Sequence, residues 1–426
     1  MPKMKPTEKT KKNSSKVSSR LSLGERVPKL RFPGFEGEWK KRDLKDCLSV
    51  CCKRNKQRFT KDEVLSVSGE YGIVNQIEFQ GRSFAGESIS NYKVVLPGLI
   101  VYTKSPLREA PYGIVKASRI ATGIVSPLYG VYIANEGIEP CFIESYFANA
   151  LRRNRYFKPL VNLGPKHTMC ISDDGALGGT IVLPEKEEQS KICDLLATLN
   201  SRIAAQRKLV ELLKKHKRGL SSVLFSGKVR VATNAKWRTY RLGDIVSRVT
   251  RKNGKATDIP LTISAQHGLI DQREFFSKAV ASSDMSGYYL LKQGEFAYNR
   301  SSSGDYPFGS IKKLERYHQG AVSTLYICFE TLGDKDDAEF LKWYFDSFAW
   351  HREIGMICAE GARNHGLLNV PTDGFFDTKH ILPSDKDERK KIASLMALAD
   401  ARCECAETEL ARLTAMKSGL LQQMFV

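Results

Sequence analysis

The sequence predicts an α+β fold in which one unit, a mixed α/β domain followed by a long helix, occurs twice. Three observations lead to this prediction. Short motifs recur in the same order at a nearly constant separation, β-rich segments alternate with loops rich in glycine, proline and serine, and each half of the chain ends in a long heptad-like pattern. The 426 residues, 42% of them hydrophobic, are enough for two domains with separate cores.

The internal repeat is visible without alignment to any other protein. Trp39 and Trp237 match at a separation of 198 residues, and the best block follows at a separation of 196. This block pairs Ser90, Tyr92, Gly98, Tyr102, Lys104 and Ser105 with Ser286, Tyr288, Gly294, Tyr298, Arg300 and Ser301. Small loop insertions produce such a drift, whereas chance would scatter the matches. We therefore expect a pseudo-twofold internal repeat.

Within each copy, short β-rich runs such as Lys93–Val95, Leu99–Tyr102 and Leu325–Phe329 lie between turn-forming residues. The aromatic segments 142–151 and 340–350 each predict one short amphipathic helix. The expected organisation, in chain order, is a basic disordered tail and lead-in at 1–37, a first domain at 38–184, a first long helix at 185–225, a linker at 226–236, a second domain at 237–383 and a second long helix at 384–426.

Each half ends in a seam of residues at alternating spacings of four and three, which begins shortly after Pro184 or Pro383. Such a seam, sustained over more than four heptads, predicts two helices of about 40 residues, each about 60 Å long. The first seam is Ile192, Leu196, Leu199, Ile203, Gln206, Val210, Leu213, Lys217, Leu220 and Leu224. The second is Ile392, Met396, Ala399, Cys403, Ala406, Leu410, Leu413, Lys417, Leu420 and Met424.

We expect the two helices to pair with each other, because so narrow a stripe suits a coiled coil better than burial on a domain surface. Burial of each helix on its own domain is the alternative. We also expect an antiparallel pair with a domain at each end, because this arrangement uses one repeat twice by rotation about a pseudo-twofold axis. The connectivity does not forbid a parallel pair.

The charge favours a polyanionic partner. Lys and Arg number 67 against 47 Asp and Glu, a formal net charge of +20, and a field of this sign attracts nucleic acids. A basic, soluble protein without a nucleic-acid role is the alternative. No run of 18 apolar residues and no apolar signal segment occurs, so we expect a cytoplasmic protein without a membrane span. The ten scattered cysteines predict reduced packing residues rather than a metal site.

Sequence motifs for catalysis and cofactor binding are missing. The chain contains no GxxxxGK[ST], GxGxxG, HExxH, GxSxG or EF-hand pattern, and its seven histidines are isolated in the sequence. We therefore expect no enzymatic activity and no cofactor. The alternative is an enzyme whose site is assembled in space from distant residues.

Candidate DNA contacts lie where each copy has a strand that ends in Tyr-x-Lys/Arg-Ser and runs into a polar loop. A cation and hydroxyls at a strand end suit contacts to phosphates and base edges. The candidates in the first copy are Tyr102, Lys104, Ser105, Arg108, Arg54, Lys166 and His167. Those in the second are Tyr298, Arg300, Ser301, Ser302, Arg251, Arg363 and Asn364. For each cluster, a structural turn with a solvated cation is the alternative.

The assembled residues resemble one family, the specificity subunits (HsdS) of type I restriction–modification enzymes. The segment 27–35, Val-Pro-Lys-Leu-Arg-Phe-Pro-Gly-Phe, followed by Trp39, is typical of how these subunits begin. Leu-Pro at 183–184 and at 382–383, each leading to a helix with Gln189 or Glu388, is similar to the family's pattern, as are the helix endings at 213–225 and 413–425. The resemblance covers residues 27–426 and rests on the ordered set, repeated twice.

The resemblance implies a DNA sequence-specificity subunit without catalytic activity. Each domain would be a target-recognition domain that reads one half of a bipartite, asymmetric site in double-stranded DNA. The helices would dock two methyltransferase subunits and set the spacing, and restriction/translocase subunits would join the full complex. S-adenosylmethionine, ATP and Mg²⁺ would belong to these partners. A helix pair of about 60 Å spans half-sites that lie about 34 Å apart. The alternative is a non-catalytic coiled-coil scaffold for protein partners.

Overall fold

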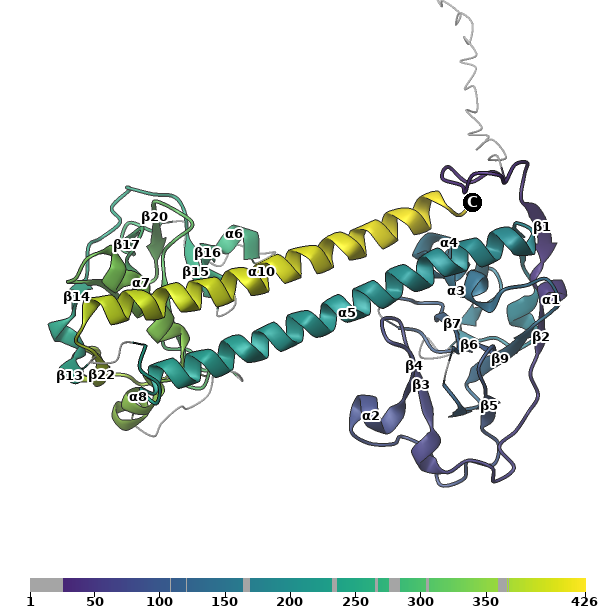
Figure 1. Ribbon diagram of the computed structural model, residues 1–426, viewed down its shortest axis with the longest axis horizontal. Helices are drawn as coiled ribbons and strands as arrows, with labels where there is room; N and C mark the ends of the chain where they lie inside the picture. The colour runs from purple at the N-terminus through teal and green to yellow at the C-terminus, as the bar shows by residue number, and fades with distance from the viewer. Residues whose placement is uncertain are drawn as a thin grey trace, which may run out of the picture. The chain divides into compact units, whose positions relative to one another are not determined.

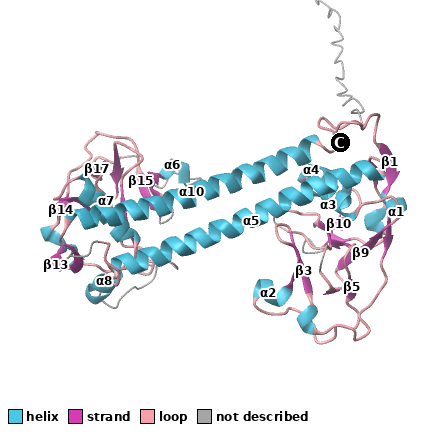
Figure 2. Cartoon of the chain, in the orientation of Figure 1, coloured by secondary structure: helices cyan, strands magenta, loops and turns pink. Residues whose placement is uncertain are grey.

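The chain forms two compact units, each with both helices and strands (Figure 1 and Figure 2). Unit 1 comprises Met1–Ala204 and Ala411–Val426, and unit 2 comprises Ala205–Leu410. The α+β class predicted from the sequence is confirmed. The computed structural model describes residues 26–107, 109–119, 121–163, 169–231, 236–264, 267–275, 284–303, 306–358, 366 and 368–426.

Unit 1 contains a four-stranded antiparallel sheet with the order β2-β9-β6-β7. Its strands are β2 (Leu48–Val50), β6 (Ile100–Thr103), β7 (Val115–Ala117) and β9 (Tyr129–Ala134). Further antiparallel pairs are β1 (Lys40–Asp43) with β12 (Thr180–Leu183), β3 (Leu65–Ser68) with β4 (Gly72–Asn75), β5 (Lys93–Val95) with β8 (Gly123–Val125), and β10 (Asn162–Leu163) with β11 (Met169–Cys170). The short helices are α1 (Leu44–Cys47), α2 (Gln76–Gln80), α3 (Pro140–Ala148) and α4 (Ala150–Phe157).

Unit 2 repeats this arrangement with the sheet order β14-β21-β18-β19. Its strands are β14 (Val246–Val249), β18 (Phe296–Asn299), β19 (Ser310–Lys313) and β21 (Ile327–Thr331). The pairs are β13 (Trp237–Arg241) with β22 (Lys379–Pro383), β15 (Leu261–Ser264) with β16 (Gly268–Asp271), and β17 (Tyr289–Lys292) with β20 (Gln319–Val322). The short helices are α6 (Gln272–Phe275), α7 (Lys335–Asp346), α8 (His351–Ile357) and α9 (Thr372–Asp377). The predicted internal repeat is therefore also a repeat of topology.

Two long helices, α5 (Lys186–Phe225) and α10 (Lys386–Gln423), follow the two domains. Every seam residue predicted from the sequence is buried or half-buried. Within unit 2 the helices run in opposite directions (Figure 1), as Gln206 Nε2 donates to the carbonyl of Ala406 at 2.9 Å while Lys217 pairs with Asp400. The predicted antiparallel coiled coil is thus confirmed. None of the helices among the described residues is long and apolar enough to cross a membrane.

The polar residue Lys217 interrupts the apolar seam of α5, and unit 2 provides partners for its charge. Its ammonium group forms an ion pair with Asp400 of α10 and lies 5.2 Å from the ring centroid of Trp343. One turn earlier, Lys214 Nζ lies 2.5 Å from a carboxylate oxygen of Glu407. A charged group that is removed from water requires such partners. These pairs favour one register of the two helices, because a shifted register would leave Lys217 without its carboxylate.

Each long helix ends in the core of the domain that belongs to the other repeat. Phe425, just beyond α10, is buried in unit 1, where its ring centroid lies 5.2 Å from that of Phe142 and 6.1 Å from that of Trp39. Phe225, the last residue of α5, is buried in unit 2, where its ring centroid lies 5.8 Å from that of Phe340. Neither core is therefore completed by its own repeat alone.

The aromatic segments fold differently from the prediction of one helix in each copy. In unit 1, α3 ends at Ala148 because Asn149 is extended, with φ −74° and ψ 122°, and its side chain caps a new helix by accepting hydrogen bonds from the N–H groups of residues 151 and 152. In unit 2, Ser347 is also extended, and α7 is separated from α8 there. The prediction was wrong because a polar capping residue ends each helix within the aromatic run.

Phe425→Ala should lower the free energy of unfolding of unit 1 by about 3–5 kcal/mol, because removing a buried phenyl ring leaves a cavity. Denaturant unfolding of the full chain, followed by tryptophan fluorescence, measures the change. The matched control is Leu151→Ala, whose side chain is 80% exposed, and it should change the stability by less than about 0.5 kcal/mol. Similar small effects of both variants would contradict the burial of Phe425.

His380 of β22 is buried in unit 2 as a neutral imidazole. The Thr378 hydroxyl donates to the carbonyl of Phe375 at 2.7 Å, so its oxygen accepts from Nε2–H of His380 at 2.8 Å. Nδ1 is then the acceptor for the Tyr344 hydroxyl, also at 2.8 Å. Burial lowers the pKa of His380 from 6.5 to about 4.

Unit 2 should therefore lose stability in mild acid. Because the pKa of His380 is lowered on folding, its contribution is fully present above pH 6.5 and is lost as the pH falls toward 4, at a cost of up to about 3 kcal/mol. Unfolding free energies measured between these pH values for the wild type and for His380→Gln test this. The variant should retain part of the pH dependence, because burial also lowers the pKa of His351 to about 4. Identical profiles of both proteins would contradict the prediction.

Candidate nucleic-acid interface

The candidate interface begins at two strand-end loops, defined as residues 104–110 after β6 and 300–306 after β18. In the first, residues 107 and 110 exchange backbone hydrogen bonds of 3.1 and 3.0 Å, and in the second, residues 303 and 306 exchange bonds of 3.1 and 2.9 Å. The two units thus close these loops with the same pair of backbone hydrogen bonds. Their side chains differ, since Lys-Ser-Pro-Leu in unit 1 replaces Arg-Ser-Ser-Ser in unit 2.

A glycine lies between each strand-end loop and the next strand of the sheet. Gly113 and Gly309 both have φ +78°, a conformation that other residues rarely adopt. A Cβ atom would lie 1.9 Å from the carbonyl oxygen of Thr103 in unit 1 and 2.1 Å from that of Asn299 in unit 2. Both positions therefore require glycine, and this requirement keeps the two loops in matching positions.

The two tyrosines that were predicted to contact DNA belong to the cores instead. Tyr102 is 1% exposed and Tyr298 is 0% exposed. Each hydroxyl donates a hydrogen bond of 2.8 Å to a backbone carbonyl, of Tyr112 in unit 1 and of Phe308 in unit 2. Burial raises the pKa of both hydroxyls. The prediction was wrong for these residues because their side chains lie in the core. There each hydroxyl binds a backbone carbonyl just after the strand-end loop.

Lys104 lies at the start of its loop and is tied to an acid. Its Nζ lies 2.9 Å from Asp173 Oδ1, and Asp173 also pairs with Lys93 of β5. Burial opposes the charge of Asp173, but the hydrogen bonds from Lys93 and Lys104 outweigh it, so the pKa of Asp173 is lowered. One carboxylate therefore holds two cations together at the edge of unit 1. Lys93 in turn pairs through its backbone with Arg54, which brings a third cation to the same region.

Arg300, the counterpart of Lys104, is held by backbone carbonyls instead of an acid. Its guanidinium donates to the carbonyl of Leu325 at 2.9 and 3.2 Å and to that of Val370 at 3.1 Å. The side chain therefore joins the strand-end loop to two other segments of unit 2. Any contact that it makes to DNA would have to use its remaining donor capacity, because these bonds occupy three of its N–H groups.

The serines of the strand-end loops, unlike the two tyrosines, lie on the surface. Ser105 in unit 1, and Ser301 and Ser302 in unit 2, are exposed. The backbone N–H of Ser302 donates to the carbonyl of Gly366 at 2.6 Å, which fixes the position of this loop. Five further predicted contacts lie outside the described residues: Arg108, Lys166, His167, Arg363 and Asn364.

A second matched feature is a pair of basic turns, defined as residues 53–58 in unit 1 and 251–256 in unit 2. Their sequences are Lys-Arg-Asn-Lys-Gln-Arg and Arg-Lys-Asn-Gly-Lys-Ala. A backbone hydrogen bond of 2.8 Å closes each turn, from the N–H of its last residue to the carbonyl of Asn55 or Asn253. Sequence reasoning identified the charge at both places but missed the asparagines as a pair.

The two asparagines hold the basic turns by the same hydrogen bonds. Asn55 is 1% exposed, its Oδ1 accepts from the N–H of Phe59 at 2.8 Å, and its Nδ2 donates to the carbonyl of Phe59 at 2.9 Å. Asn253 is 4% exposed and makes the same two bonds with Thr257, at 3.1 and 3.0 Å. In each unit Nδ2 also lies 3.3 Å from a carbonyl in the segment before β5 or β17. A buried amide with these partners fixes a turn firmly.

The exposed cation next to the buried asparagine is also tethered in the same way in both units. Arg54 Nη1 donates to the carbonyl of Asn91 at 2.9 Å, and Lys252 Nζ donates to that of Gly287 at 3.0 Å. The structure thus pairs Arg54 with Lys252, a match that the sequence also indicates, because the two lie 198 residues apart like the first tryptophans. Arg251, which the sequence prediction selected as a DNA contact, is the counterpart of Lys53.

Arg251 itself is partly withdrawn from the surface. Its Nη2 lies 2.5 Å from Oε1 of Glu295, which is buried, and the second oxygen of Glu295 accepts from the backbone N–H of Lys292 at 2.8 Å. The charge of Arg251 is therefore largely compensated inside unit 2. Its counterpart in unit 1, Lys53, is exposed.

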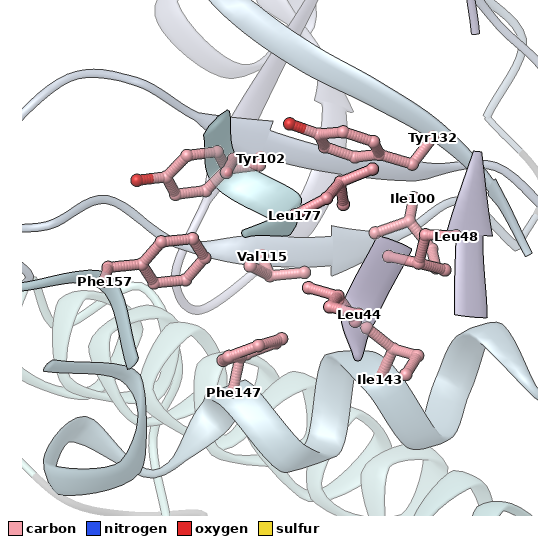
Figure 3. Close-up of a pocket in the computed structure, with 11 residues that line it drawn as sticks. Leu44, Leu48, Ile100, Tyr102, Val115, Tyr132, Ile143, Phe147, Phe157 and Leu177 are labelled. Carbon is pink, nitrogen blue, oxygen red and sulfur yellow. The ribbon is translucent and has the colours of Figure 1, made fainter. Parts of the chain in front are cut away.

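A cavity in the core of unit 1 offers no room for a substrate. In unit 1, apolar side chains from the sheet and the helices, among them Leu44, Tyr102 and Phe157, point toward one another around a void of about 10 Å³ (Figure 3). Such a volume is close to that needed for a single water molecule. Among the described residues, no group of three or more His, Cys, Asp or Glu is placed to hold a metal ion. The surface loops are therefore the better candidates for a functional site.

The fold is similar to that of S subunits of type I restriction–modification systems. The S subunit from M. genitalium has 14% sequence identity and a TM-score of 0.56, with 94% of this chain and 99% of that chain covered. The HsdS subunit from Thermoanaerobacter tengcongensis has 14% identity and a TM-score of 0.43, with 93% and 97% covered. At this identity the first likeness shows a common fold, so the resemblance found in the sequence is confirmed at the level of the fold. No protein-family model and no curated protein sequence matches the chain.

Asn55→Ala and Asn253→Ala should each lower the free energy of unfolding of their own unit by about 1–3 kcal/mol, because backbone groups of the turn then lose their partners. Denaturant unfolding of the full chain measures both effects. Asn91→Ala is the matched control, because only its backbone carbonyl binds Arg54 and its side chain is exposed. A control as destabilised as Asn55→Ala would show that the buried amide has no special role.

Proposed function

We propose that this protein is a DNA sequence-specificity subunit of a type I restriction–modification complex. Each unit reads one half of a bipartite, asymmetric site in double-stranded DNA. The observation that carries the proposal is the duplication, in which two units share one fold and the same loop-closing hydrogen bonds but present different side chains from the loops. Two copies of one reader with different loops suit a site whose halves differ in sequence.

The charge and exposure of the loops support a DNA ligand. The net charge of +20 favours association with a phosphate backbone. Ser105 of unit 1 and Ser301 and Ser302 of unit 2 are exposed hydroxyls, which can donate to and accept from base edges. The cations Lys104 and Arg300 position these loops, through Asp173 in unit 1 and through backbone carbonyls in unit 2.

Catalysis is assigned to partner subunits, which the long helices dock. On the unit 2 portions of α5 and α10, Leu209, Leu212, Leu395 and Leu398 are exposed. Exposed leucines one turn apart on each helix offer apolar contacts to a partner protein. We assign them to the contact with one of two methyltransferase subunits. Restriction/translocase subunits join the full complex. The chain itself then needs no cofactor.

The same exposed leucines would also suit a scaffold that binds proteins and leaves DNA untouched. DNA binding by the full chain separates the two functions. The experiment is selection from a randomised duplex pool by the purified chain, followed by sequencing of the bound fraction. A bipartite motif with two unlike halves is expected from a specificity subunit. If no sequence is enriched and the chain does not protect DNA from nuclease digestion, the scaffold function is supported instead.

Combined Ser301→Ala and Ser302→Ala substitutions should change one half of the selected motif and leave the other. Loss of a hydroxyl from a base contact costs about 1 kcal/mol, or about a fivefold loss of preference for the correct base. Sequencing of the pool bound by the variant measures this. Ser201→Ala, an exposed serine of α5, is the control and should leave both halves unchanged. Equal weakening of both halves would contradict a unit-specific role of the loop.

A further inference from the structure

The basic turns and the strand-end loops are duplicated to different degrees, and this difference separates two kinds of DNA contact. The phosphate backbone of a duplex is nearly the same whatever its sequence, whereas base edges differ at every step. Two units that read different half-sites should therefore share the parts that hold the backbone. They should differ in the parts that read bases. This reasoning rests on the proposed function.

The basic turns belong to the shared part. Both carry two cations followed by a buried asparagine, Lys-Arg-Asn in unit 1 and Arg-Lys-Asn in unit 2. The asparagines make matching hydrogen bonds, and both turns are closed by a backbone bond of 2.8 Å. The exposed cations Arg54 and Lys252 are tethered to carbonyls at 2.9 and 3.0 Å. Arginine in one unit and lysine in the other provide the same charge but different donor geometry.

This exchange of arginine for lysine argues against base reading at the turns. The planar fork of arginine gives two parallel hydrogen bonds of fixed geometry, and the compact ammonium group of lysine does not reproduce that geometry. A phosphate accepts either cation. A turn that keeps its buried asparagine, its closing backbone bond and its charge, but not its donor geometry, therefore suits a phosphate.

The backbone conformation of the basic turns also suits a functional site. Lys56 and Gln57 have φ of 36° and 66°, which is unusual for residues other than glycine, and Gly254 has φ 58° at the position that matches Lys56. Left-handed conformations at non-glycine residues are costly and cluster at functional sites. At Lys56, an exposed cation, unit 1 keeps the left-handed conformation of Gly254 although no glycine is present there. The turns differ at the next position, because Gln57 is left-handed and its counterpart Lys255 is not.

The strand-end loops belong to the part that differs. Lys104 is held by the carboxylate of Asp173, whereas Arg300 is held by carbonyls of Leu325 and Val370. The residues that follow are Ser-Pro-Leu in unit 1 and Ser-Ser-Ser in unit 2. The loops therefore offer different hydrogen-bonding groups from one common position, as readers of different bases should.

We propose that the basic turns are sequence-independent clamps for the DNA phosphate backbone, with Arg54 in unit 1 and Lys252 in unit 2 as the principal phosphate contacts. The strand-end loops of the same units read the bases. Asn55 and Asn253 are positioning residues, because each acts by holding its turn and its adjacent cation in place.

The test measures binding of the full chain to a fluorescein-labelled duplex pool of random sequence while the KCl concentration is raised. Each lost phosphate contact should reduce the slope of log K against log[KCl] by about 0.9. Arg54→Gln and Lys252→Gln should each produce this reduction, and the double variant about twice as much. Lys335→Gln, which removes an exposed cation at the start of α7, is the control and should leave the slope unchanged.

Two further measurements separate a clamp from a base reader. Arg54→Lys should keep the wild-type slope, because a phosphate accepts either cation. The motif selected from the randomised pool should be the same for the wild type, Arg54→Gln and Lys252→Gln, although the variants bind more weakly.

An unchanged salt slope in the glutamine variants, or the loss of one half of the motif, would overturn the clamp and leave the proposed function intact. A wild-type chain that binds no duplex at all would overturn both. Circular dichroism melting of each variant shows whether weaker binding arises from a damaged fold.

Discussion

The burial of each helix end in the core of the other repeat's domain is the interaction on which both units depend. Phe425 packs against Phe142 and Trp39, and Phe225 packs against Phe340. Aromatic side chains of this size contribute several kcal/mol when buried. Each domain core is therefore incomplete until the distant helix supplies its last turn. This requirement also determines the antiparallel course of the helices within unit 2, where Lys217 meets Asp400.

The two copies of the repeat share the residues that the backbone conformation requires, and they differ in the loop side chains that a ligand would contact. Gly113 and Gly309 are identical because a Cβ atom would strike a carbonyl oxygen in either unit. Asn55 and Asn253 are identical because each closes a buried set of hydrogen bonds. The loops between these fixed points differ in charge placement and in hydroxyls. A common support with different loops is what an asymmetric DNA reader needs, and it is the basis of the proposed function.

Positive charge in the sequence identified the loops and turns of the candidate interface, but not which cations in them are available to bind DNA. Lys104, Arg251 and Arg300 all bind groups within their own unit, so much of their charge or donor capacity serves the fold. Arg54 and Lys252 each give one hydrogen bond to a carbonyl and remain exposed, and Lys252 also lies 4.5 Å from the ring centroid of Tyr289. An exposed cation on a rigid turn is better prepared to meet a phosphate, because little side-chain entropy is lost when it binds.

The duplication, the two long helices and their seams can be predicted from the sequence alone, because they depend on periodicity and on residues close together in the chain. Every predicted seam position from Ile192 to Leu224 and from Ile392 to Met424 is buried or half-buried. Which polar residues face outward depends instead on contacts that form when the chain folds. The partner of Lys104 is Asp173 and that of Arg300 includes Val370. Both partners lie about 70 residues further along the chain, so no local pattern reveals them. For the same reason, the burial of Phe425 among residues of the first domain becomes visible only once the chain is folded.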